Sequence, residues 1–89
     1  MLETAIVIKN KLGLHARAAV KFVNTANRFS AEVKIEKDGS EIDGKSILGI
    51  LTLAATQGTE IILRAEGVDE EAALKALVGL IDKKFDEKE

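Results

Sequence analysis

The 89-residue sequence lacks cysteine, proline, tryptophan and tyrosine, and it contains a single histidine. Without cysteine the chain has no disulfide framework and no thiolate nucleophile. One histidine without cysteines also lacks the ligand set of a transition-metal site. We therefore expect neither a metal nor another cofactor.

Charge and hydropathy exclude two further classes of partner. The sequence has 13 Lys and Arg against 15 Asp and Glu, and aromatic residues make up 3%. A nucleic-acid-binding protein needs a basic surplus and rings that stack on bases, so no nucleic acid is expected. The longest apolar stretch, 47–55, is interrupted by Gly49 and Thr52 and is too short to span a bilayer. No basic segment followed by an apolar run opens the sequence, so we expect a cytoplasmic protein with no membrane partner.

Length and composition predict one domain. With 89 residues, of which 46% are hydrophobic and 31% charged, the chain is long enough for one modest core but not for two. This balance is typical of a soluble globular protein. We expect a single domain over residues 1–89 and a monomer.

Hydrophobic periodicity predicts four strands and three helices. The strands are expected at 2–8, 31–36, 40–43 and 60–66, and the helices at 16–27, 46–53 and 69–84. Asp38-Gly39 predicts a two-residue hairpin turn, because both central residues of that turn need positive φ. The order β-α-β-β-α-β-α predicts an α+β fold: an antiparallel four-stranded sheet with helices on one face and solvent on the other.

His15 is the first candidate functional residue. It stands where a loop with Gly13 meets an alanine-rich helical pattern, and Arg17 follows two residues later. The first N–H groups of a helix lack internal acceptors and carry the positive end of the helix dipole, so phosphate binds there readily. A neutral imidazole nitrogen is also a nucleophile. The arrangement suits a residue that accepts and transfers a phosphoryl group, although a lone histidine is more often a surface or core residue.

The first predicted helix carries a basic face. Arg17, Lys21, Asn24 and Arg28 lie at helical spacing, with three positive charges and no acid. In a chain of net charge −2, this concentration favours an anion held beside His15 or an acidic protein docked there. The alternative is an ordinary solvated helix face.

The second predicted helix has more large apolar residues than one narrow stripe needs. Ile50 and Leu53 are expected to face the sheet, which leaves Ile47, Leu48 and Leu51 partly outward. Exposed apolar patches of this kind mark partner-binding surfaces. The alternative is that these side chains fill gaps under neighbouring loops.

Ser46 is expected to be the N-cap of this second helix. That position is structural by itself, since serine is a preferred cap. It is also a position where an added phosphate is favoured, because a dianion is stabilised at a helix N-terminus.

Two motifs together resemble one protein family. Gly13-Leu14-His15-Ala16-Arg17 and, about thirty residues later, Gly44-Lys45-Ser46-Ile47-Leu48-Gly49 are similar to the histidine-containing phosphocarrier (HPr) family of the bacterial phosphotransferase system. The likeness runs nearly end to end and includes Thr56-Gln57-Gly58-Thr59 and Ala65-Glu66-Gly67. It implies an open-faced β-sandwich of four antiparallel strands and three helices, in the order predicted above.

The resemblance also implies roles for individual residues. His15 corresponds to the histidine that the family phosphorylates on Nδ1, and Arg17 to its active-centre arginine. Ser46 corresponds to the regulatory serine that a dedicated ATP-dependent HPr kinase/phosphorylase modifies in many bacteria. The surface expected to bind enzyme I and IIA domains comprises Leu14, Arg17, Val20, Ile47, Leu48 and Leu51, to which the basic helix face adds Lys21 and Asn24.

The resemblance implies a phosphocarrier that accepts phosphate on His15 from enzyme I and passes it to IIA domains. Such a protein is not an enzyme in its own right, because its partners supply the chemistry. One alternative is a regulatory protein that acts through Ser46 and protein docking with little sugar transport. A second is a small enzyme with His15 as general base, which is disfavoured because no catalytic carboxylate or nucleophile accompanies it in the sequence.

Two details qualify the resemblance. The family usually has proline after the arginine, where this chain has Ala18; alanine keeps the helix but does not stiffen its first turn. The segments Asn10-Lys11-Leu12-Gly13 and Phe85-Asp86 are similar to the nitrogen-regulatory branch of the family. The sequence therefore leaves open whether the protein serves sugar uptake or nitrogen regulation.

Overall fold

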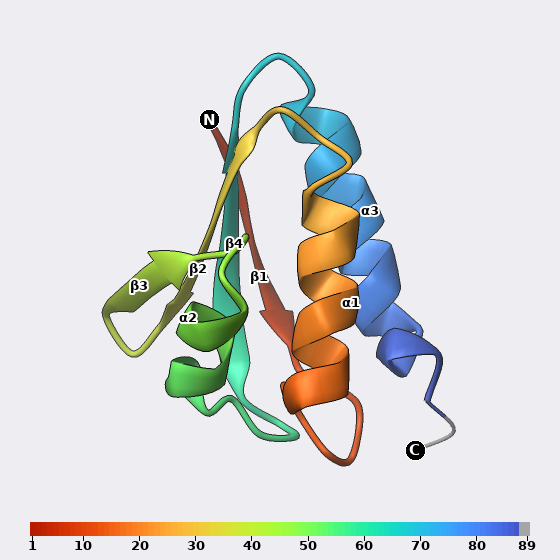
Figure 1. Cartoon of the computed structure of the whole chain (residues 1–89). Helices are drawn as coiled ribbons and strands as arrows, with labels where there is room; N and C mark the ends of the chain where they lie inside the picture. Colours follow the sequence, from red (N-terminus) through yellow and green to blue (C-terminus); the bar gives the residue numbers. More distant parts are fainter. Residues whose placement is uncertain (88–89) are drawn as a thin grey trace.

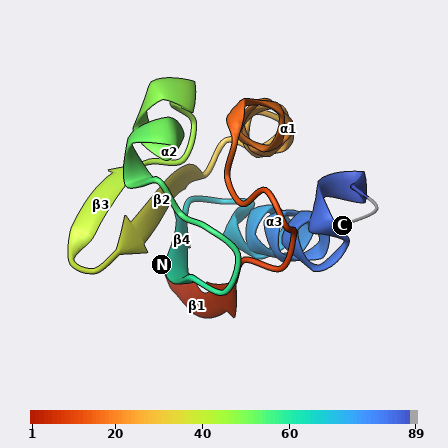
Figure 2. The same cartoon turned by 90° about the horizontal axis from the view of Figure 1, so that it is seen from below.

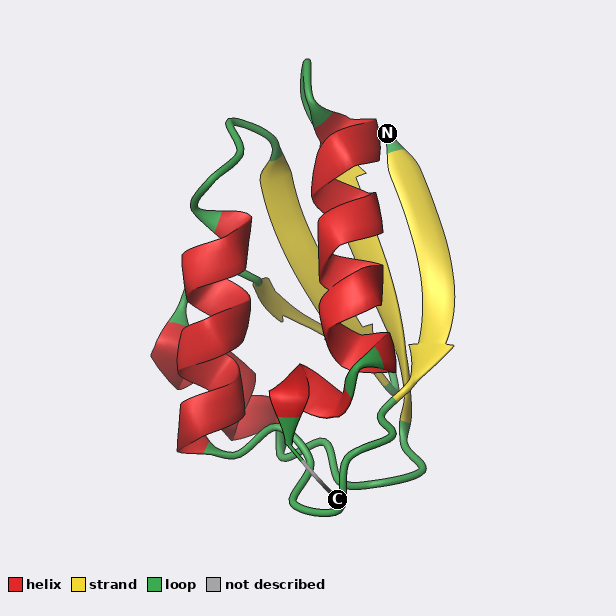
Figure 3. Ribbon diagram, turned by 90° about the vertical axis from the view of Figure 1, so that its right-hand side faces the viewer, coloured by secondary structure: helices red, strands yellow, loops and turns green. Residues whose placement is uncertain are grey.

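The computed structural model describes residues 1–87 and contains a four-stranded antiparallel sheet in the order β1-β4-β2-β3. The strands are β1 (Leu2–Val7), β2 (Glu32–Lys37), β3 (Ser40–Asp43) and β4 (Glu60–Glu66). The helices are α1 (Ala16–Ala26), α2 (Ile47–Leu53) and α3 (Glu70–Asp82). All three helices lie on one face of the sheet (Figures 1 and 3). The predicted α+β architecture and the order of its elements are confirmed.

The two faces of the sheet differ in chemistry, as alternation along the strands predicts. On the helical face, Ile61 of β4 lies opposite Ile6 of β1, and Leu63 lies opposite Ile35 of β2. On the open face, the Arg64 guanidinium contacts three carboxylates. Its Nε lies 2.8 Å from Glu3, and its Nη1 lies 2.7 Å from Glu36 and 2.9 Å from Glu41. The open face is therefore a solvated, ion-paired surface.

The hairpin between β2 and β3 turns where the sequence predicts. Lys37 pairs with Ser40, and the two residues between them, Asp38 and Gly39, have φ of 50° and 85°. Both residues thus occupy the left-handed region that a tight hairpin turn requires.

The core fills the space between the sheet and the helices. Helix α1 packs against both α2 and α3, which Figure 2 shows from below. The largest fully buried helical side chains are Phe22, Ile50, Leu77 and Ile81. Within residues 1–87, no helix is long and apolar enough to cross a membrane.

The C-terminal segment differs from the prediction. Helix α3 ends at Asp82 rather than at the cations that follow it, and the chain then forms a short 3₁₀ turn, η1 (Lys84–Asp86). The three residues of η1 have φ of 56°, 55° and 61°, so the backbone reverses sharply there. The Phe85 ring is fully buried in the core as a result.

Ala54 ends α2 in an unfavourable backbone conformation. Its φ is 53° and ψ is 39°, a left-handed position that glycine adopts without steric cost. We expect Ala54→Gly to raise the free energy of unfolding by about 1 kcal/mol, measured by urea denaturation. Ala72→Gly, the same change on the exposed side of α3, is the control and should lower it by about 1 kcal/mol. Equal losses in both variants would contradict the prediction.

Candidate functional site

His15 occupies the N-cap position of α1. Its backbone is extended, with φ of −74° and ψ of 178°, and its side chain makes no cap hydrogen bond. The His15 carbonyl accepts the Ala19 N–H at 2.8 Å. The imidazole therefore does not accept hydrogen bonds from the first-turn N–H groups of α1. These N–H groups can donate to an acceptor that is not part of the helix.

The loop before His15 is fixed by a close backbone approach. Gly13 has φ of +67°, and a Cβ there would lie 2.5 Å from the Ala55 carbonyl oxygen. The Leu14 N–H donates to the same carbonyl at 2.9 Å, and Asn10 Nδ2 donates to the Gly13 carbonyl at 2.8 Å. The loop therefore lies against the residues that follow α2, and only glycine fits at position 13.

The imidazole has a partner that the sequence analysis did not identify. His15 Nε2 lies 2.5 Å from Glu87 Oε2, and Asn10 Nδ2 donates to Glu87 Oε1 at 3.0 Å. Burial disfavours ionisation of this carboxyl, but the hydrogen bonds from His15 and then Asn10 outweigh it and lower the pKa of Glu87. An ionised carboxylate only accepts hydrogen bonds, so Nε2 is the protonated nitrogen. In residues 1–87, no hydrogen bond engages Nδ1.

No local signal in the sequence would have found this contact, because Glu87 lies 72 residues from His15. It depends on the reversal at Lys84–Asp86, which brings the C-terminal segment beside the start of α1 (Figure 1). The acidic residues near the C-terminus were the only hint available.

The structure corrects the predicted role of one residue of the partner surface and shows a contact of a second. The Leu14 side chain is 4% exposed and belongs to the core, because the bond to Ala55 turns the loop inward; it offers no surface to a partner. Lys21 is half-buried and its Nζ donates to the Phe85 carbonyl at 2.6 Å. Its ammonium group therefore contacts the C-terminal segment, and its place on the partner surface stays a prediction.

The other predicted residues of α1 are exposed. Arg17, Val20 and Asn24 all lie on the solvent side of the helix. Within residues 1–87, the Arg17 guanidinium makes no hydrogen bond or ion pair, so its charge is available next to the helix N-terminus.

Helix α2 agrees closely with the sequence analysis. Ile50 and Leu53 are buried, whereas Ile47, Leu48 and Leu51 are exposed, Leu48 by 76%. Exposed apolar side chains thus gather on the solvent side of α2, beside α1.

Ser46 is the N-cap of α2, as predicted. Its Oγ accepts the Gly49 N–H at 3.0 Å. The loop before His15 contacts Ala55, at the other end of this helix, and seven residues of α-helix span about 10 Å. His15 and Ser46 therefore flank the exposed apolar face of α2 at opposite ends rather than meeting.

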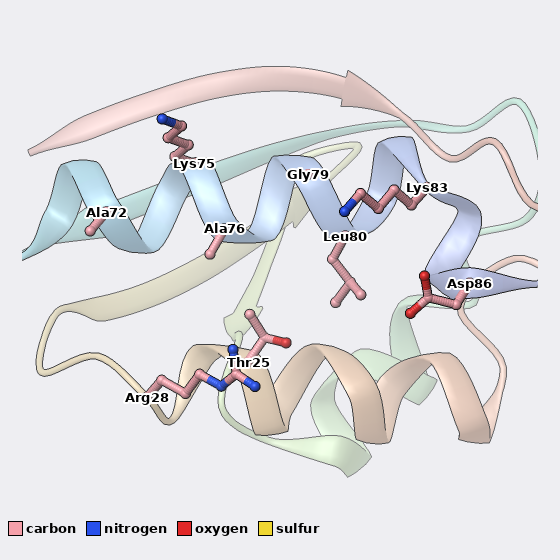
Figure 4. Close-up of a pocket in the computed structure, with 9 residues that line it drawn as sticks. All are labelled: Thr25, Arg28, Ala72, Lys75, Ala76, Gly79, Leu80, Lys83 and Asp86. Carbon is pink, nitrogen blue, oxygen red and sulfur yellow. The ribbon is translucent and has the colours of Figure 1, made fainter.

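A separate groove lies between α1 and α3 (Figure 4). Its floor is made of small residues of α3, and three cations, Arg28, Lys75 and Lys83, stand around it with one acid, Asp86. It contains neither His15 nor Ser46 and is not part of the candidate site.

The order of strands and helices, with a histidine capping the first helix, defines an open-faced β-sandwich of the phosphocarrier type. The family model described as "PTS HPr component phosphorylation site" matches residues 2–83. The chain belongs to this HPr family, as the resemblance in the sequence implied.

Individual relatives agree with this family. The phosphocarrier protein HPr of Neisseria meningitidis is 51% identical over 89 residues, covering 100% of both chains. The crystal structure of HPr-C-His from Thermoanaerobacter tengcongensis has a TM-score of 0.97 and 53% identity, again over 100% of both chains. The solution structure of Crh, the Bacillus subtilis catabolite repression HPr, has a TM-score of 0.67 and 42% identity over 90% of this chain and 95% of that chain.

Family membership bears on two other predictions. Relatives are named phosphocarrier proteins, which carry phosphate rather than catalyse a reaction, in agreement with the prediction that the chain is not an enzyme. Solved relatives include dimers of T. tengcongensis HPr and of Crh. The monomeric state of this chain stays a prediction.

Proposed function

We propose that His15 accepts a phosphoryl group on Nδ1 from phosphorylated enzyme I and passes it to a histidine of a IIA domain. The observation that carries this proposal is which nitrogen of the imidazole is hydrogen-bonded. Glu87 occupies Nε2, while Nδ1 is left with its lone pair at the start of α1. A lone pair that no hydrogen bond engages, at the start of a helix, suits an in-line attack on an incoming phosphorus.

Arg17 and the first turn of α1 would hold the transferred group. Once attached to Nδ1, the phosphoryl oxygens carry negative charge close to the positive end of the helix dipole. Arg17 is exposed, and a guanidinium presents paired donors that suit phosphate oxygens. These contacts would stabilise the same charge in the transition state of each transfer.

The docking surface would combine charge with apolar area. Val20, Ile47, Leu48 and Leu51 are exposed large hydrophobic residues, and Arg17 supplies positive charge at the His15 end. A partner with an apolar centre and an acidic rim fits this surface, since charge complementarity steers association and apolar contact holds it. Enzyme I and IIA domains would then use one overlapping surface in turn.

Incubation with enzyme I and phosphoenolpyruvate tests the proposal directly. Acid-labile phosphate on His15 that moves on to a IIA domain supports the carrier. Turnover of a small molecule without partner proteins would point to an enzyme instead and would overturn it.

Regulation through Ser46 is a second candidate function. Two observations favour it: the Ser46 hydroxyl lies at the N-terminus of α2, and it adjoins the exposed Ile47 and Leu48. The similarity to Crh, a protein named for catabolite repression, agrees with a regulatory role. An HPr kinase/phosphorylase would be the partner, with phosphate added to the Ser46 hydroxyl.

Ser46→Asp should slow phosphorylation of His15 without weakening the fold. Aspartate remains a good N-cap and places negative charge at the positive end of the helix dipole, so the melting temperature should stay equal or rise slightly. The added charge faces a partner surface that we expect to be acidic, so the KM for this chain in the enzyme I reaction should rise several-fold. High salt should reduce the effect by screening.

Ser40→Asp is the matched control, because Ser40 is an exposed serine in β3 that is not part of the proposed partner surface. It adds the same charge and should leave the enzyme I kinetics unchanged. Unaltered kinetics in Ser46→Asp would leave Ser46 as a simple helix cap and remove the regulatory candidate.

A further inference from the structure

Residues 84–87, near the C-terminus, lie beside the candidate phosphorylation site. Glu87 Oε2 lies 2.5 Å from His15 Nε2, and the side chains are 13% and 26% exposed respectively. The contact is thus largely shielded from solvent, and a charged hydrogen bond there is stronger than one on an open surface.

Several independent contacts hold Glu87 in place. The Phe85 ring is buried in the core, and the Lys21 ammonium donates to the Phe85 carbonyl. Asn10, itself buried, donates to the second Glu87 oxygen and to the Gly13 carbonyl. Asn10 therefore ties the Glu87 carboxylate to the loop that carries His15.

We propose that Glu87 is a positioning residue for His15: its carboxylate keeps the ring proton on Nε2 and thereby presents the lone pair on Nδ1. The proposal rests on the function proposed above. It adds a residue from the far end of the chain to the phosphoryl-transfer site, and it assigns that residue a defined effect on the tautomer and charge of the imidazole.

The transfer step shows why a carboxylate at Nε2 helps. The Nδ1 lone pair attacks phosphorus, the new N–P bond forms, and the bond from phosphorus to the enzyme I histidine breaks with its electron pair returning to that nitrogen. No proton leaves His15. The ring therefore becomes an N-phosphorylated imidazolium that still carries its proton on Nε2, and the Glu87 carboxylate offsets the positive charge that develops.

The tautomer is measured on the unphosphorylated protein by ¹H–¹⁵N NMR at a pH where the ring is neutral. In the wild type we expect the Nε2–H tautomer to dominate and its proton to be protected from exchange by Glu87. In Glu87→Gln the amide either accepts from or donates to Nε2, so the protected signal should weaken and the ring should shift toward a mixture of tautomers.

Asp86→Asn is the matched control, because Asp86 is the neighbouring acid and its side chain is exposed. It removes the same charge without touching the ring and should keep the wild-type spectrum. A wild-type ring protonated on Nδ1, or identical spectra for Glu87→Gln and Asp86→Asn, would overturn the proposal.

The enzyme I reaction supplies the second measurement. Glu87→Gln should lower kcat about tenfold, the order expected for loss of one charge-assisted hydrogen bond to a developing charge, while KM changes little. Loss of stability alone would lower neither kcat nor the Nε2–H signal in a folded sample. An unchanged kcat overturns the proposed role in transfer. If wild-type His15 accepts no phosphate at all, the proposed function fails, and the spectra still decide the tautomer.

Discussion

His15→Ala should abolish the acceptance of phosphate from enzyme I and lower the stability of the fold only modestly. The chain has no other histidine, so no second imidazole can take over the transfer. The His15 side chain makes no cap hydrogen bond to α1, and its backbone carbonyl, which accepts the Ala19 N–H, is kept in alanine. Glu87 retains its hydrogen bond from Asn10. Because Glu87 loses one of its two hydrogen bonds, we expect the free energy of unfolding to fall by about 1–2 kcal/mol.

The experiment follows acid-labile labelled phosphate and the melting temperature side by side. Thr25→Ala is the control: Thr25 lies on α1 and lines the separate groove toward α3, outside the expected partner surface, and its truncation tests whether any truncation on this helix blocks the reaction. It should keep accepting phosphate. An alanine variant at position 15 that still accepted acid-labile phosphate at the normal rate would refute the assignment of His15.

Features with a local cause were predictable from the sequence. Apolar residues recur every second position in the strands and every three to four positions in the helices, because one face of each element lies against the core. The hairpin at Asp38-Gly39 forms because glycine adopts positive φ without steric cost. The division of α2 into buried Ile50 and exposed Leu48 follows from helical spacing against one sheet. These predictions needed no knowledge of contacts between distant residues.

Features that depend on distant contacts were not predictable in the same way. The family resemblance placed Leu14 on the partner surface, yet its N–H donates to the Ala55 carbonyl and its side chain is buried in the core. Lys21 looked free because helical spacing places it on a polar face, but the Phe85 carbonyl engages it. Both contacts join residues that lie far apart in the sequence.

The reversal after α3 is the least predictable feature and the one with the greatest effect on the site. Lysine and phenylalanine do not favour positive φ, and aspartate adopts it only occasionally, yet all three of Lys84, Phe85 and Asp86 adopt it. Left-handed backbone is unfavourable for such residues. Burial of the Phe85 ring and the Lys21 bond to its carbonyl offset that strain.

Phe85→Ala should therefore lower the free energy of unfolding by about 3–5 kcal/mol, the usual range for removing a fully buried ring. Alanine keeps the Cβ, so the left-handed backbone at position 85 remains equally strained while the contacts that offset it are lost. We expect the segment to detach from the core and to withdraw Glu87 from His15. Urea denaturation measures the first effect, and loss of the protected Nε2–H signal measures the second.

Leu77→Ala separates these two effects. Leu77 is fully buried in α3, and its truncation should also cost roughly 2–5 kcal/mol, but it leaves the Phe85 anchor in place. The Nε2–H signal of His15 should then persist in the folded fraction. If both variants lose stability and both keep the signal, Phe85 is only a core residue. If only Phe85→Ala loses it, burial of one ring near the C-terminus controls the proton on the histidine at the start of α1.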